Sequence, residues 1–169
     1  MPCPNPLTGY DLGFVVGMFE GEGAIALNRT CRPGRDRPYF TVHLSVTNTC
    51  LDLLRAFEKA VGIGKISSKP VGERRRPCWV WRCWRQADSL WLLEQMQPRL
   101  LAKAEKAELV MPFLRSRLAL GARFRANCQR VYSADDVQIW ERYIRLDSYV
   151  AAGNNWGAKQ GRGENAAVD

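Results

Sequence analysis

Three glycines recur every four residues within a segment, residues 8–21, whose apolar spacing predicts a helix. The apolar side chains form a stripe along one face of this helix: Leu12, Val15, Val16 and Phe19. Gly13, Gly17 and Gly21 leave the other face without side chains. Each glycine costs a helix about 1 kcal/mol relative to alanine, so three are expected only where another backbone comes very close. The helix should therefore bury its stripe and present its glycines to a second helix.

The segments that follow change from helical spacing to alternation. Residues 24–32 and 39–47 alternate apolar and polar side chains, and the Pro- and Gly-containing run between them predicts a turn. A second hairpin is predicted from residues 63–69 and 79–84. Further helices are predicted over residues 50–61, 87–96, 99–119 and 134–150. We assign all of these elements to one domain, residues 1–150, followed by a tail rich in Gly, Asn and Ala, residues 151–169.

The net charge of +8 is concentrated in two stretches. Residues 65–85 hold seven basic side chains and one acidic one, and residues 99–130 hold eight basic and two acidic ones. Residues 1–28 instead carry three acids and no base. Clustered positive charge is typical of proteins that bind a polyanion such as nucleic acid. A solvated, solubilising surface is the alternative.

Composition excludes several other classes of protein. Hydrophobic residues make up 46% of the chain, which excludes a wholly disordered protein. No apolar run approaches the roughly 18 residues that cross a bilayer, and the first residues lack the pattern of a secretion signal. The six cysteines form no C-x-x-C pair, so a zinc site is not expected. We expect a protein that is neither secreted nor bound to membranes, in the cytoplasm, the nucleus or an organelle according to its host.

Alternation gathers polar and basic side chains on one face of the predicted sheet. Together with the loop of the second hairpin, they make up the candidate DNA-binding surface: Ala26, Asn28, Thr30, Arg32, Tyr39, Thr41, His43, Ser45, Lys65, Ser67, Lys69, Arg74, Arg75 and Arg82. A sheet with a dry face on helices and a wet, basic face can lie in the major groove of DNA, where base edges present a readable code. An ordinary antiparallel sheet with one side in water has the same pattern. The basic side chains collected on this face favour double-stranded DNA as the partner.

Two acidic residues, Glu20 and Glu22, stand at the C-terminal end of the glycine-faced helix. Unpaired carbonyl groups already make the local field negative there, so acids are unfavourable unless a cation neutralises them. A divalent metal ion supplies such a cation, and hard oxygen ligands beside a phosphate suit Mg²⁺. Two solvated carboxylates at a helix end are the alternative.

The run VVGMFEGEG, residues 15–23, resembles the signature of the LAGLIDADG homing endonucleases position by position. Gly17, Glu20, Glu22 and Gly23 fall on its fixed places. Residues 46–48 and residues 97–103 are also similar to segments of this family. The order of elements over about residues 8–120 matches as well. The resemblance implies an α+β fold with an αββαββα core, an antiparallel, saddle-shaped sheet and additional C-terminal helices.

The resemblance also implies roles for individual residues. Glu22 is the expected ligand of Mg²⁺, which Mn²⁺ can replace, and the Gly21 carbonyl is a further candidate ligand. Asn48 is expected to position the attacking water and Lys103 to stabilise charge. The alternative for Lys103 is a plain base on a solvated helix. Glu20 is expected to have a supporting or structural role.

A single copy of the motif implies a homodimer in which two copies of the first helix pack about a two-fold axis. The residues expected at this interface are Gly13, Val16, Gly17, Glu20 and Gly21. Two-fold symmetry requires a pseudo-palindromic target. The implied function is a site-specific DNA endonuclease, encoded by an intron or an intein, that makes metal-dependent double-strand breaks with short 3′ overhangs in a long target. A non-catalytic DNA-binding regulator of the same fold and a maturase that binds intron RNA are the alternatives.

Two features depart from the family's usual pattern. Both motif acids are Glu, which is one methylene longer than the commoner Asp. The basic residue often found after the second strand is absent from residues 49–52, and Arg55, Arg74 or Arg75 is the candidate substitute. The single histidine, His43, is expected to contact a base or the DNA backbone rather than to act in catalysis.

Overall fold

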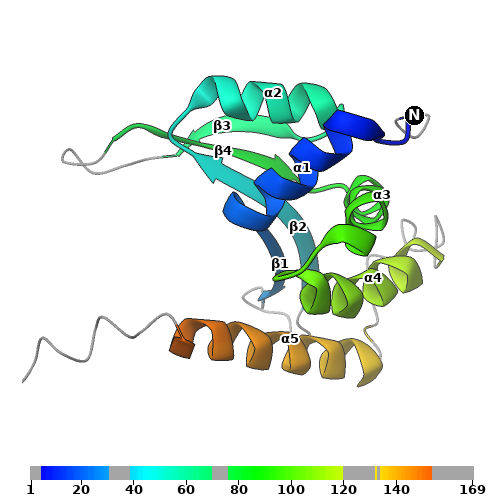
Figure 1. Cartoon of the computed structure of the whole chain (residues 1–169). Helices are drawn as coiled ribbons and strands as arrows, with labels where there is room; N and C mark the ends of the chain where they lie inside the picture. Colours follow the sequence, from blue (N-terminus) through cyan, green and yellow to red (C-terminus); the bar gives the residue numbers. More distant parts are fainter. Residues whose placement is uncertain (1–4, 31–38, 70–75, 120–131, 133, 154–169) are drawn as a thin grey trace, which may run out of the picture.

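The computed structural model describes residues 5–30, 39–69, 76–119, 132 and 134–153, with the backbone alone for residues 147–153 (Figure 1). The structural statements below concern these residues. Three of the predicted DNA-binding residues, Arg32, Arg74 and Arg75, lie outside them, as does most of the predicted tail.

The elements follow one another in the predicted order. They are α1 (Gly9–Glu22), β1 (Gly23–Thr30), β2 (Tyr39–Asn48), α2 (Leu51–Val61), β3 (Lys65–Lys69), β4 (Cys78–Cys83), α3 (Gln86–Met96), the short 3-10 helix η1 (Gln97–Arg99), α4 (Ala104–Ala119) and α5 (Ala134–Gly153). The sheet is antiparallel, in the order β1-β2-β4-β3, so the two hairpins meet along β2 and β4. The predicted α+β core with additional C-terminal helices is confirmed. None of the described helices has the length and apolar character needed to cross a membrane.

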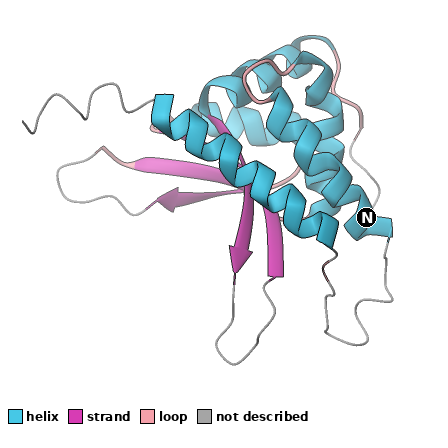
Figure 2. Ribbon diagram, turned by 90° about the horizontal axis from the view of Figure 1, so that it is seen from below, coloured by secondary structure: helices cyan, strands magenta, loops and turns pink. Residues whose placement is uncertain are grey.

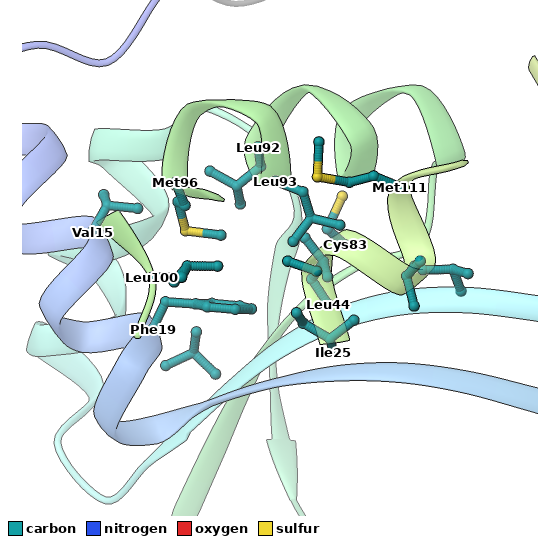
Figure 3. Packing of buried hydrophobic residues seen from close by; sticks show 14 of the residues in the cluster. Val15, Phe19, Ile25, Leu44, Cys83, Leu92, Leu93, Met96, Leu100 and Met111 are labelled. Atoms are coloured by element: carbon teal, nitrogen blue, oxygen red, sulfur yellow. The ribbon is translucent and has the colours of Figure 1, made fainter. Parts of the chain in front are cut away.

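Helices cover one face of the curved sheet and leave the other without a covering helix (Figures 1 and 2). Alternation along the strands turns the larger apolar side chains toward the helices: Ile25, Leu27, Phe40, Val42, Leu44, Val46, Trp81 and Cys83, all of them buried. Figure 3 shows Phe19 of α1 and Met96 of α3 in this core. The predicted apolar stripe of α1 is buried as well. α1 therefore packs into the core with the expected side.

The predicted helix over residues 99–119 was wrong in its first turn. α4 begins only at Ala104, and residues 100–103 are not helical. Backbone N–H groups of this turn bind the carboxylate of Glu20 instead of continuing a helix. Because the partner lies 81 positions earlier in the chain, helical spacing alone does not encode this break.

α5 packs against α4 and β1. The Tyr143 hydroxyl donates a hydrogen bond to the Ile25 carbonyl oxygen at 2.7 Å. Arg117 of α4 forms an ion pair with Asp136 of α5, and its guanidinium carbon lies 4.2 Å from the centre of the Tyr132 ring. This helix is therefore tied to the core by buried polar contacts as well as by apolar packing.

Candidate active site and nucleic-acid interface

The chain passes directly from α1 into β1 at Gly23. A Cβ atom at this position would lie 2.4 Å from the Phe19 carbonyl oxygen, so a larger residue would displace backbone. The last two residues of the helix, Gly21 and Glu22, are exposed. The motif therefore ends α1 with an accessible carboxylate outside the packed core.

The other acid of the motif, Glu20, is held by the turn that precedes α4. Its carboxylate accepts hydrogen bonds from the backbone N–H groups of Leu101 (3.0 Å), Ala102 (3.0 Å) and Lys103 (3.4 Å). Negative charge near the N-terminus of a helix is stabilising. Glu20 thus ties the turn that precedes α4 to the end of α1. Its carboxylate is engaged within the chain, which leaves little of it for the expected dimer interface.

Lys103 lies in the same turn, half-buried, close to both acids. Its ammonium group donates to the backbone carbonyl oxygen of Glu20, in the last turn of α1. Burial lowers the pKa of Lys103, Lys106 lowers it further, and the charges of Glu20 and Glu22 oppose that change. The side chain joins the turn to α1 within electrostatic range of Glu22, and its expected role in stabilising charge stays a prediction.

Asn48 ends β2 at the same end of the sheet as Glu22. Gly23 pairs with Val46 in the strand register, so Asn48 extends two residues past Gly23 toward the last turn of α1. Its side-chain oxygen accepts a hydrogen bond from the Cys50 N–H at 2.8 Å, just before α2 begins. The side-chain NH₂ group is a donor that this bond does not use.

Arg55 is the one candidate substitute for the missing basic residue that lies in the described part of the chain. It pairs with Asp52 in the same helix, α2, at 3.1 Å, and both side chains are exposed. An exposed pair of this kind contributes little to stability. The guanidinium of Arg55 therefore remains accessible to an anionic ligand.

Two hard oxygen donors stand at the end of α1, the Glu22 carboxylate and the Gly21 carbonyl, and such oxygens are the ligands that Mg²⁺ prefers. Within the described residues, no group of three or more His, Cys, Asp or Glu is placed to hold a metal ion. Mg²⁺ is commonly bound by one or two carboxylates and keeps several waters, so the chemistry of this donor set fits the ion.

The strand register brings the predicted DNA-binding residues of the sheet together on the face opposite the core. Those in the described part of the chain are Ala26, Asn28, Thr30, Tyr39, Thr41, His43, Ser45, Lys65, Ser67, Lys69 and Arg82. Ser45 of β2 pairs with Arg82 of β4, which pairs in turn with Lys65 of β3. The four strands contain no acidic residue within their bounds. The described cations of this open face, Lys65, Lys69 and Arg82, lie on β3 and β4, and β1 and β2 add mainly polar side chains.

The glycine face of α1 is bare. An added Cβ atom at Gly13, Gly17 or Gly21 would meet nothing within 4 Å, and all three glycines are exposed. Tyr10, one turn before Gly13, is 83% exposed. Val16, which was also expected at the dimer interface, is only 8% exposed and belongs to the core. The exposed surface of α1 therefore includes the three glycines and Tyr10, together with Asp11 and Glu22.

No protein-family model and no curated protein matches the sequence. Solved structures share its fold, however. The homing endonuclease I-CvuI in complex with a DNA target is 17% identical, over 94% of this chain and 88% of that one, with a TM-score of 0.57. The archaeal intron-encoded homing endonuclease I-Vdi141I complexed with DNA is 14% identical, over 95% and 89%, with a TM-score of 0.58. The LAGLIDADG homing endonuclease I-GzeII in complex with its DNA target is 12% identical, over 82% and 44%, with a TM-score of 0.57.

The chain has the LAGLIDADG homing endonuclease fold. The resemblance that rests on residues 15–23 and on the order of elements is thereby confirmed. The chain matches I-CvuI and I-Vdi141I over most of their length, but I-GzeII over less than half. In size it therefore corresponds to the first two.

Sequence analysis missed one aromatic residue on the open face of this LAGLIDADG sheet. Trp84 directly follows β4, is 59% exposed, and lies 4.4 Å from His43 between ring centres. The signal for it was present, because alternation from Arg82 through Cys83 returns Trp84 to the polar face. The same face also holds a hydrogen bond from Arg82 to the Ser67 hydroxyl at 3.5 Å.

Proposed function

We propose that this protein is a site-specific DNA endonuclease, encoded by an intron or an intein, that acts as a homodimer and depends on Mg²⁺, which Mn²⁺ can replace. The observation that carries the proposal is the exposed carboxylate of Glu22 beside the half-buried Lys103, at one end of a positively charged sheet face without acids. The fold adds support, because its solved neighbours include endonucleases in complex with DNA.

The chemistry of the residues at the end of α1 is suited to phosphodiester cleavage. Glu22 and the Gly21 carbonyl would bind the metal ion, which supplies Lewis-acid charge and a more acidic water when bound. The Lys103 ammonium would stabilise negative charge that develops on the phosphate. Asn48 would hold the water or a phosphate oxygen by donating a hydrogen bond from its NH₂ group. A neutral amide is not a base that could remove the proton of the water.

The bare face of α1 supports a two-fold dimer. Small residues spaced by four allow two helices to approach backbone to backbone, and nothing within the described chain fills the space beside Gly13, Gly17 and Gly21. Such packing would bring the two Glu22 carboxylates near the symmetry axis, where both would serve one target. A two-fold protein of this kind requires a pseudo-palindromic DNA sequence.

Cleavage of a randomised duplex library, followed by sequencing of the cut ends, tests the proposed function. With Mg²⁺ we expect double-strand cuts with short 3′ overhangs at one pseudo-palindromic sequence. EDTA and Glu22→Gln should each abolish cutting, and Lys103→Met should slow it by about a hundredfold or more. Glu141→Gln, which removes an exposed charge on α5, is the matched control and should cut normally. Selective binding without cutting in any divalent metal ion would contradict the endonuclease and favour a regulator or a maturase.

The variant Gly17→Ala distinguishes an effect on dimerisation from an effect on folding. The added methyl group meets nothing within one chain, and alanine stabilises a helix by about 1 kcal/mol relative to glycine. We therefore expect a variant that unfolds at a slightly higher urea concentration, sediments as a monomer and no longer makes double-strand cuts. Lys59→Ala on the exposed side of α2 serves as the control. A Gly17→Ala protein that remains a fully active dimer would contradict packing through this face.

A further inference from the structure

Three side chains from neighbouring strands meet on the open face of the sheet: Asn28 of β1, His43 of β2 and Trp84 after β4. β2 lies between β1 and β4 (Figure 1). The His43 ring lies 4.4 Å from the Trp84 ring, tilted by 32°, and the Nδ1 atom of His43 lies 3.3 Å from the Nδ2 atom of Asn28. The histidine is therefore held from both sides.

The contact with Asn28 determines which nitrogen of His43 carries the proton. The Nδ2 group of asparagine is a donor only, so Nδ1 of His43 acts as the acceptor and the hydrogen of the neutral ring is on Nε2. A second proton would point an N–H at the Asn28 NH₂ group. The nitrogen left for a ligand is therefore Nε2, and it is a donor.

The surroundings of His43 favour the neutral ring. Burial lowers the pKa of His43 below its ordinary value of 6.5, and the charge of Arg82 lowers it further. Lys65, which pairs with Arg82, adds positive charge on the same face, and the four strands supply no acid that would oppose it. At neutral pH His43 is thus an uncharged donor among cationic side chains.

We propose that His43, held by Asn28 and Trp84, discriminates against cytosine at one position in each half of the DNA target by donating its Nε2 hydrogen to a base acceptor in the major groove. This rests on the proposed function, since it assumes that the open face binds DNA. Guanine presents two acceptors in the major groove, N7 and O6, and adenine and thymine present one each, whereas cytosine presents a donor. The position read by His43 should therefore favour guanine over cytosine by roughly five- to tenfold, near the lower limit for a bidentate contact. Asn28 and Trp84 act as positioning residues.

The first test reads the tautomer directly, without DNA. The chain has a single histidine, so a ¹⁵N–¹H correlation spectrum of the imidazole needs no assignment. At neutral pH we expect Nε2 to carry the proton and Nδ1 to be bare. Asn28→Asp should move the proton to Nδ1, because a carboxylate only accepts hydrogen bonds. The control is Thr41→Asp, which adds the same charge at the cross-strand partner of Asn28 and should leave the tautomer unchanged. A proton on Nδ1 in the unaltered protein would overturn the inference.

The second test measures base preference by selection from a randomised duplex library. His43→Ala should remove the guanine preference at one symmetric pair of positions and leave the others unchanged. His43→Gln places an amide donor near Nε2 and should restore that preference in part. Trp84→Ala should weaken the preference, because the ring is then less well oriented. Asn28→Asp, assayed near pH 8 so that the ring is neutral, should lose it, whereas Gln138→Glu, which adds one negative charge on the exposed side of α5, should not.

The outcomes separate this inference from the proposed function. If the protein selects and cuts a pseudo-palindrome but His43→Ala changes no base preference, the inference is wrong and the endonuclease proposal stands. If no sequence is selected under any condition, the proposed function fails and the inference fails with it, whatever the tautomer. Wild-type selection of cytosine rather than guanine at the His43 position would also overturn the inference.

Discussion

The two ends of α4 each hold a basic side chain close to an acidic one, in different surroundings. At the C-terminal end, the side chains of Arg117 and Asp136 are each only 7% exposed, and the guanidinium lies over the rings of Phe113 and Tyr132. At the N-terminal end, Lys103 is half-buried in a turn and donates to a backbone carbonyl oxygen. The Arg117–Asp136 pair is enclosed by the chain, whereas Lys103 lies next to an exposed surface.

This difference indicates which of the two charges is available for chemistry. A buried ion pair holds two elements together, and each charge neutralises the other instead of being available to a ligand. Lys103 instead lies within electrostatic range of Glu22, which is exposed and open to a ligand. Burial lowers the pKa of Lys103 against the opposing effect of two acids, and groups perturbed in this way cluster at functional sites. We therefore expect the C-terminal end of α4 to matter for stability and the N-terminal end for activity.

The largest effect on stability is expected from Arg117→Met. Removing one partner leaves the carboxylate of Asp136 buried without its counter-charge, which should cost about 3–5 kcal/mol of unfolding free energy. Urea titration measures this loss. The double variant Arg117→Met, Asp136→Leu should recover most of it, because neither charge is then buried alone. DNA cleavage by the folded fraction should be unchanged in both variants. A loss of unfolding free energy below about 1 kcal/mol in Arg117→Met would contradict this prediction, because the pair would then behave like an exposed ion pair.

An intermediate effect is expected from Glu20→Ala, which removes the acceptor of three backbone N–H groups in residues 101–103. Losing hydrogen bonds to a charged group should cost about 1–3 kcal/mol. The amide hydrogens of these residues should exchange with solvent faster than those of α3. Glu20→Gln keeps one acceptor oxygen, so its stability and amide exchange rates should lie between those of the wild type and of Glu20→Ala. Glu141→Gln is the control for the loss of an exposed charge. Unchanged exchange at residues 101–103 in Glu20→Ala would contradict the role of Glu20 in holding this turn.

Most of the fold could be predicted because its elements follow from local periodicity. The alternation of residues 39–47 and the helical stripe of α1 require no knowledge of the rest of the chain. The turn before α4 could not be predicted in the same way, since the carboxylate of Glu20 that holds it comes from α1. Burial of the core positions was predictable for the same reason as the strands, because alternation assigns each side chain to a face.

The candidate site was predictable only in part. Glu22, Asn48 and Lys103 were chosen because they resemble a motif, and whether they act in catalysis is for the cleavage assays to decide. The relation between Glu20 and Lys103 depends on a contact between distant segments, which spacing along one chain does not reveal. Trp84 was not among the predicted site residues, although alternation assigned it to the polar face.

The smallest effect on stability, and the sharpest contrast with Arg117, is expected from Lys103→Met. Because the folded pKa of Lys103 lies below the ordinary 10.5, the unfolded chain binds the proton more readily, and the charged side chain slightly opposes folding. Lys103→Met should therefore be as stable as the wild type at neutral pH or more stable by less than about 1 kcal/mol, since the side chain is only half-buried and solvent screens part of the effect. This advantage should shrink as the pH rises toward 10.5, where the wild-type lysine loses its charge. A large loss of stability in Lys103→Met would show that both ends of α4 stabilise the fold. It would contradict the expectation that Lys103 serves activity rather than stability.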